Sequence, residues 1–219
     1  MLTVDLLNKN IPRLQLQDTV GKARQLINDF RLSHLPVVSE GKFLGLISEE
    51  DLLDADAKTP MEFLQKNFVN ASVPDNIHFL NAVNSSIQFD TTVVPLVNAE
   101  NDFIGVITSS DLLKMLGNFS GANEIGGIIV INMERQQFAI SEISRIVESN
   151  ECSILHLNTI TDSLTGTLVV TLHINKREIA ALVATFERYD YDVIYFFGNE
   201  KFENEINTNY RHLMNYLDI

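Results

Sequence analysis

The chain has 219 residues, of which 45% are hydrophobic and 21% charged, and its formal net charge is −13. This length allows one large domain or two ordinary ones, and the acidic balance argues against a nucleic-acid partner or adsorption to anionic lipid. No stretch approaches about 18 consecutive apolar residues, the start carries no signal pattern, and the one cysteine, Cys152, cannot form an internal disulfide. We therefore expect a cytoplasmic protein without a membrane partner.

The first half of the chain predicts two copies of one unit, in which a helix, two strands and a second helix follow one another. The elements of the first copy are a helix at 20–30, strands at 35–38 and 43–47, and a helix that begins near 52. Those of the second copy are a helix at 77–87, strands at 93–97 and 103–107, and a helix at 109–116. We place the first repeat at about 1–58 and the second at about 59–117.

A motif that occurs twice supports this division. Residues 45–53 read GLISEEDLL, and 60 residues later residues 105–113 read GVITSSDLL. Each copy follows an apolar strand that contains one proline, Pro36 or Pro95. Repeated units of this kind cannot bury their apolar faces alone, so we expect one pseudo-symmetric pair with a ligand cleft between its halves.

After a small-residue stretch at 117–123 the pattern changes, and we assign a linker at 118–125. The predicted elements are then strands at 127–131, 153–160, 166–174 and 191–197, with helices at 138–148 and 177–188. Their order, βαββαβ, is that of the ferredoxin-like fold, which we place at 126–198. In the segment 199–219 an apolar stripe predicts an amphipathic helix that packs on its own chain or on a twin subunit: Phe202, Ile206, Tyr210, Leu213 and Leu217.

The doubled motif resembles the tandem CBS (cystathionine-β-synthase) module, a family of regulatory adenine-nucleotide sensors. The second half looks like an ACT domain, a small regulatory module that often senses amino acids. The combination resembles the acetoin-utilisation regulatory proteins. This resemblance implies a fold of the α+β and α/β classes, with a tandem CBS pair at 1–117 before a ferredoxin-like (βαββαβ) ACT-like domain.

The resemblance also implies ligand contacts. In the family, the hydroxyl residue of the motif contacts phosphate and the aspartate accepts hydrogen bonds from the ribose diol, which points to Ser48 and Asp51 and to Thr108 and Asp111. The alternative is structural, because Ser/Thr-x-x-Asp at the start of a helix is also a capping box. Both interpretations are compatible, and the second copy is the stronger candidate.

Three further residues complete the predicted adenosyl site. His34 stands where the family often keeps a polar or basic residue, and Leu35 and Val94 could form apolar walls around an adenine ring. Apolar residues on strands more often simply pack in the core.

Charge limits the choice of ligand. The first motif contains Glu49 and Glu50, where the second has Ser109 and Ser110. Negative charge at this position disfavours a polyphosphate, so AMP, adenosine or the cationic S-adenosylmethionine should be tolerated better than ATP without a metal ion.

The ACT-like half departs from its family in the loop 132–137, which has no acidic residue followed by Pro-Gly, so we expect dimerisation or partner contact, with amino-acid sensing as the weaker alternative. His156 and His173 should face each other across the arms of a hairpin around 162–165. No further ligand accompanies them, so we predict a polar sheet face and not a metal site.

The sequence has no nucleophile–base pair, no P-loop and no cluster of metal ligands, so no catalytic residue is predicted and an enzyme is not expected. We expect a non-catalytic regulatory homodimer that senses an adenosyl ligand in the cleft between the repeats and acts on an unidentified target protein. The alternative is a ligand-free structural or adaptor protein that mediates homodimerisation or partner binding.

Overall fold

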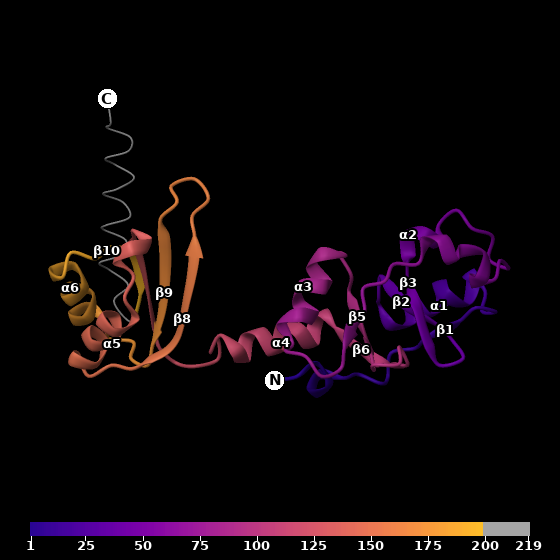
Figure 1. The fold of residues 1–219 in the computed structure, drawn as a ribbon, viewed down its shortest axis with the longest axis horizontal. Helices are drawn as coiled ribbons and strands as arrows, with labels where there is room; N and C mark the ends of the chain where they lie inside the picture. The colour runs from indigo at the N-terminus through magenta and orange to yellow at the C-terminus, as the bar shows by residue number, and fades with distance from the viewer. Residues whose placement is uncertain (199–219) are drawn as a thin grey trace, which may run out of the picture. The chain divides into compact units, whose positions relative to one another are not determined.

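The computed structural model describes residues 1–198 (Figure 1). The predicted amphipathic helix at 199–219 lies outside the described residues. The chain divides into two compact units, the first covering Met1–Leu116 and the second beginning at Gly117. Among the described residues, no helix is both long enough and apolar enough to cross a membrane.

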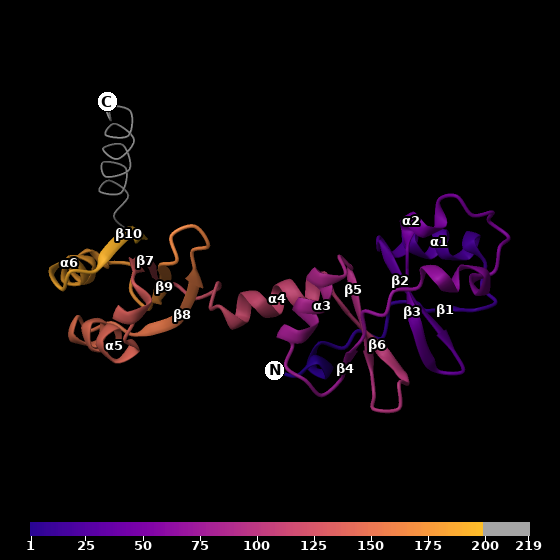
Figure 2. The ribbon, with the colours of Figure 1, turned by 45° about the horizontal axis from the view of Figure 1, so that its top comes forward.

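The first unit contains two three-stranded mixed sheets, ordered β1-β2-β3 and β4-β5-β6, which Figure 2 shows from a second direction. The first repeat comprises β1 (Leu14–Gln15), α1 (Val20–Phe30), β2 (His34–Ser39), β3 (Lys42–Ser48) and α2 (Glu49–Leu52). The second comprises β4 (Val73–Pro74), α3 (Leu80–Gln88), β5 (Val93–Val97), β6 (Phe103–Thr108) and α4 (Ser109–Phe119). The predicted pair of repeated units is confirmed.

The two sheets share one register. Leu14 pairs with Val37 in the first sheet, and Val73 pairs with Leu96, 59 positions further on in each case. Each inner strand also pairs antiparallel with the next, and both ladders have an irregularity after the proline. The extra residue of the second repeat lies in the turn between β5 and β6, so that the motifs after the turn are 60 residues apart.

Each repeat is completed by a segment from outside its predicted bounds. The 3₁₀ helix η1 (Thr3–Leu6) packs on the second repeat, where Leu6 and Leu7 contact the core and Asn8 forms a bridge with Val106. The 3₁₀ helix η2 (Met61–Asn67) packs in the same way on the first repeat. The packing therefore departs at both ends from the repeat bounds predicted at 1–58 and 59–117, because each sheet needs a crossing segment to cover its outer strand.

The crossing segments explain the glycine that begins each motif. A Cβ atom on Gly45 would lie 2.6 Å from Phe68 Cβ, and one on Gly105 would lie 2.6 Å from Leu7 Cδ1. A side chain at position 45 would push the crossing segment away from the strand that it covers, whereas at position 105 the Leu7 side chain would have to turn aside.

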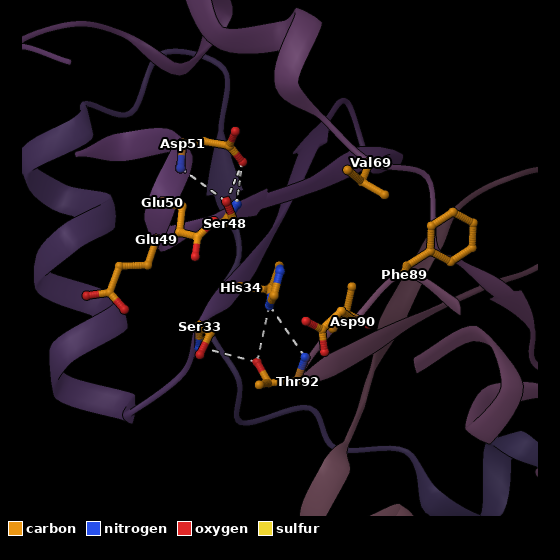
Figure 3. Close-up of a pocket in the computed structure, with 11 residues that line it drawn as sticks. Ser33, His34, Ser48, Glu49, Glu50, Asp51, Val69, Phe89, Asp90 and Thr92 are labelled. Atoms are coloured by element: carbon orange, nitrogen blue, oxygen red, sulfur yellow. Dashed lines mark hydrogen bonds between the residues drawn. The ribbon is translucent and has the colours of Figure 1, made fainter. Parts of the chain in front are cut away.

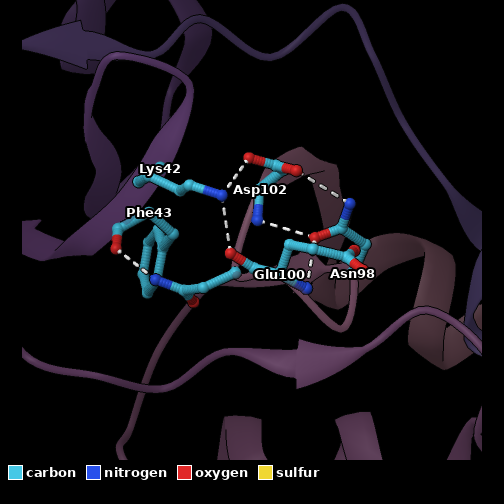
Figure 4. Close-up of polar contacts among 6 residues, drawn as sticks. Lys42, Phe43, Asn98, Glu100 and Asp102 are labelled. Carbon is cyan, nitrogen blue, oxygen red and sulfur yellow. Dashed lines mark hydrogen bonds and ion pairs between the residues drawn. The ribbon is translucent and has the colours of Figure 1, made fainter.

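The turns at the ends of the two hairpins also contact each other (Figure 4). Lys42 Nζ lies 2.6 Å from Asp102 Oδ1 and donates to the Glu100 carbonyl oxygen at 2.7 Å. The amide of Asn101 donates to the Phe43 carbonyl oxygen, and the Phe43 and Phe103 rings stack with centroids 6.3 Å apart. These contacts join the two repeats at the end opposite the motifs.

The second unit is a four-stranded antiparallel sheet of order β10-β7-β9-β8. Its elements are β7 (Gly127–Met133), η3 (Arg135–Gln137), α5 (Ile140–Ser149), β8 (Ile154–Thr161), β9 (Leu168–Ile174), α6 (Ala180–Arg188) and β10 (Asp192–Phe197). Helices α5 and α6 bury one face of the sheet in a continuous apolar core (Figures 1 and 2). The predicted ferredoxin-like order is confirmed, and so is the pairing of His156 with His173.

Candidate functional site

The first motif forms a tight junction between β3 and α2. The backbone N–H of Asp51 donates to Ser48 Oγ at 3.1 Å, and the backbone N–H of Ser48 donates to Asp51 Oδ2 at 3.1 Å, which is a complete capping box. The Ser48 hydroxyl also donates to Asp51 Oδ2. The helix that this box begins, α2, has only four residues and ends at Leu52, so the predicted start near 52 is wrong: the Ser48 cap starts the helix three residues earlier.

The second oxygen of Asp51 is also occupied. Asn67 Nδ2, from the crossing segment η2, donates to Asp51 Oδ1 at 3.0 Å. Asp51 Oδ2 thus accepts from both Ser48 groups, whereas Oδ1 accepts only from Asn67, so a ligand hydroxyl would share Oδ1 with the Asn67 amide.

A cleft with a volume of about 450 Å³ lies beside this junction, between the two repeats. The first repeat contributes the start of β2 and the motif, and the second contributes the turn between α3 and β5. Figure 3 shows side chains from both sides around the opening, and the full lining is Ser33, His34, Ser48, Glu49, Glu50, Asp51, Val69, Phe89, Asp90, Thr91 and Thr92.

His34 connects the two sides of the cleft. The backbone N–H of Thr92 donates to His34 Nδ1 at 3.4 Å, and the backbone N–H of Ser33 donates to Thr92 Oγ1 at 3.2 Å (Figure 3). Burial lowers the pKa of His34 below its ordinary value of 6.5, against the opposing effect of Asp90, Asp51 and Glu50. A neutral imidazole suits this contact, since Nδ1 must accept a hydrogen bond from the Thr92 amide.

The second motif forms a similar junction between β6 and α4. Thr108 Oγ1 donates to Asp111 Oδ2 at 2.7 Å, and the backbone N–H of Asp111 donates to Thr108 Oγ1 at 3.2 Å. The other oxygen, Asp111 Oδ1, has only a long ion pair of 3.9 Å with Lys114 among the described residues. Helix α4 has 11 residues, so this junction leads into three helical turns rather than one.

The structure brings some of the predicted site residues together and separates others. His34, Ser48 and Asp51 line the cleft. Leu35 and Val94 are fully buried in the cores of the first and second repeat and do not line it. In this structure both residues pack as core residues, and contact with a ligand would require them to move.

The sequence analysis missed the turn Phe89–Thr92, which forms the opposite wall of the cleft. Its Asp90 has a left-handed backbone, with φ of 48°. The repeat offered a signal, because Arg31 occupies the same place in the first repeat and has φ of 53°. A residue with positive φ just before each proline-containing strand marks this turn twice.

The histidine pair and the cysteine belong to the second unit. No group of three or more His, Cys, Asp or Glu residues within 1–198 could hold a metal ion. His156 pairs with His173 and packs edge-on against Phe119, with ring centroids 6.0 Å apart. Cys152 is buried, and its thiol donates to the Asn150 carbonyl oxygen.

Comparison with known proteins identifies the first unit. Residues 4–58 match the family model of the CBS domain. A crystal structure from Thermotoga maritima, described as a CBS domain pair/ACT domain protein, has a TM-score of 0.51 at 19% identity and covers 54% of this chain and 98% of its own. Residues 4–58 are thus similar to the CBS domain, and the first unit has the fold of a CBS domain pair.

Two further similarities concern the same region. An acetoin utilization protein from Vibrio cholerae is 23% identical, with a TM-score of 0.48, and covers 56% of this chain and 95% of its own. Homoserine O-acetyltransferase from Methanobrevibacter ruminantium is 25% identical over 119 residues, which are 52% of this chain and 24% of that protein. The chain thus spans about a quarter of the length of the curated relatives that it matches first.

Proposed function

We propose that this CBS domain pair is a non-catalytic sensor of an adenosyl ligand, bound between its two repeats. The observation that carries the proposal is the cleft of about 450 Å³, which both repeats line and into which the Ser48–Asp51 motif of the first repeat faces. Its volume is within the range of small-molecule sites.

The second motif is the better candidate for a ligand that carries phosphate. Asp111 keeps one oxygen without a short hydrogen bond from the described residues, so it can accept a ribose hydroxyl without losing its cap. The 11-residue helix α4 directs its N-terminal dipole at this junction, and Ser109 and Ser110 add hydroxyl groups instead of charge. The pseudo-symmetry relates Arg31 of the first repeat to Asp90 of the second. It therefore places a cation beside the second motif, where the first motif has Asp90.

The proposed mechanism is a shift between two arrangements of the repeats. Contacts such as that of His34 with Thr92 cross the pair at the motif end, while the Lys42–Asp102 ion pair joins it at the other end. A ligand that contacts both repeats favours the arrangement that brings its contacts together. The ACT-like unit, a homodimer partner or a target protein would then respond to that arrangement.

A ligand screen tests this proposal. The purified chain is heated with AMP, ATP, adenosine or S-adenosylmethionine, and the melting temperature is recorded. A ligand at a hundredfold excess over its Kd adds about 2.7 kcal/mol of stability if it binds only the folded state. A saturable rise that Asp51→Ala or Asp111→Ala removes supports the sensor, whereas no rise with any of the four at millimolar concentration would contradict it.

One observation favours the alternative, a ligand-free adaptor. At the first motif Asp51 already has three hydrogen-bond donors from Ser48 and Asn67, so this carboxylate acts as a cap without any ligand. The adaptor predicts that Asp111→Ala changes only stability, by the value of a cap, about 1 kcal/mol.

A further inference from the structure

Thr91 lines the cleft beside the first motif (the first cleft), and its hydroxyl group is buried without a hydrogen-bond partner among the described residues, so a ligand reaches this group only if the side chain turns toward the cleft. The residue is 4% exposed, and its Oγ1 is the buried side-chain atom that has no hydrogen-bond partner among the described residues. Its backbone is fixed on both sides, because the N–H donates to the Ser86 carbonyl oxygen and the carbonyl oxygen accepts from Ser86 Oγ at 2.7 Å. A polar group that is buried and unpaired in this way is costly unless a ligand or water supplies the missing bond.

The charge around this hydroxyl group has one sign. The cleft is lined by four carboxylates, Glu49, Glu50, Asp51 and Asp90, and none of its described lining residues is Lys or Arg. The one basic group is His34, which is half-buried and neutral near pH 7. A phosphate group in this cleft would meet repulsion without a counter-charge from the lining.

The surroundings of the second motif differ at each of these positions. The pseudo-symmetry relates Leu32 to Thr91 and Arg31 to Asp90. It relates Ser109 and Ser110 to Glu49 and Glu50. The unpaired hydroxyl and the acidic wall therefore belong to the first cleft and are not a general feature of the repeat.

We infer that the first cleft selects an adenosyl ligand without phosphate, neutral or cationic, and that the Thr91 hydroxyl is one of its contacts. This inference rests on the proposed function and adds that the two motifs prefer ligands of different charge. Glu50 and Asp90 exclude phosphate, while Thr91 supplies a donor and acceptor for a hydroxyl or amine of the ligand.

Adenosine and AMP are the two probes, because they differ only by the phosphate. Their affinities for the full chain are measured by calorimetry, together with those for Thr91→Val, Thr91→Ser and Glu50→Gln. Thr91→Val should weaken adenosine binding about tenfold, the value of one lost hydrogen bond, and should not lower the melting temperature of the ligand-free chain. Thr91→Ser keeps the hydroxyl and should bind adenosine as the parent does.

Glu50→Gln should improve AMP binding several-fold relative to adenosine, since it removes one carboxylate from the lining. The control is Glu62→Gln, which makes the same charge change at an exposed position of the same unit outside the lining. Equal affinity for AMP and adenosine in the parent, with no response to Glu50→Gln or Thr91→Val, would overturn the inference and leave the proposed function intact. No binding of either probe would overturn both.

Discussion

The two motif aspartates should differ in what they contribute to stability. Asp51→Ala removes a capping carboxylate and also leaves the Asn67 amide and the Ser48 N–H without their acceptor. Asp111→Ala removes a carboxylate that accepts one short hydrogen bond, from the Thr108 hydroxyl, and whose other oxygen has only the 3.9 Å ion pair with Lys114. We therefore expect Asp51→Ala to be the more destabilising of the two substitutions.

The expected difference follows from the hydrogen bonds. Loss of a helix cap costs about 1 kcal/mol, and the partly buried donors that Asp51 satisfies add about 1 kcal/mol more. Asp51→Ala should thus lower the free energy of unfolding by about 2 kcal/mol and Asp111→Ala by about 1 kcal/mol. A large part of this difference should disappear in an Asn67→Leu background, because that variant has no amide to leave unpaired.

Urea denaturation followed by far-UV circular dichroism measures both values on the full chain. Adding adenosyl ligands separates stability from binding. Under the proposed function, Asp111→Ala loses the ligand-induced stabilisation by AMP even though it is the milder variant. Equal destabilisation by the two substitutions, or loss of AMP stabilisation only in Asp51→Ala, would refute the assignment of the second motif as the phosphate-preferring site.

Three further predictions test the site and its support. Because burial lowers the pKa of His34 in the folded state, the unfolded chain takes up the proton at a higher pH than the folded chain. The free energy of unfolding should therefore fall as the pH falls below about 6.5. His34→Gln should flatten this part of the plot of stability against pH, and an unchanged plot would contradict the prediction. Arg31→Ala should weaken AMP binding several-fold but leave adenosine binding unchanged, and calorimetry that shows equal losses would argue against a phosphate contact. Gly45→Ala should destabilise the chain by about 1–3 kcal/mol, because its Cβ would lie 2.6 Å from Phe68 Cβ. Its control, Gly117→Ala, lies in α4 with open space around the added Cβ and should stabilise the chain by about 0.5–1 kcal/mol. Urea denaturation compares the two variants.

The pattern of the sequence was enough to predict both repeats and the order of the second unit. Local periodicity fixes where strands such as β5 lie, and here the predicted and observed bounds agree at Val93–Val97. Helix α3 begins at Leu80, three residues after the predicted start, because the N-terminal segment holds the residues before it: the Ile77 carbonyl oxygen accepts from the Thr3 N–H, and His78 forms a bridge with Leu2. The apolar residues Leu35 and Val94 carried no local sign of whether they face a core or a cleft.

The parts that could not be predicted depend on contacts between distant segments. Neither the packing of η1 on the second repeat nor the position of the Phe89–Thr92 turn opposite the first motif follows from periodicity. Both require the register of one repeat against the other. The acidic character of Glu49 and Glu50 was visible in the sequence, but Asp90 and Thr91 join them only in three dimensions.

The crossing segments also explain why two nearly identical motifs have different chemistry. The bridges Leu46–Val69 and Val106–Asn8 align the two crossing segments, and this alignment places Leu6 where the first repeat has Asn67. Asn67 donates to Asp51, whereas Leu6 packs in the apolar core and has no side-chain donor for Asp111. A single exchange of amide for hydrocarbon, outside the motif itself, therefore leaves one aspartate engaged as a cap and the other with an oxygen available to a ligand.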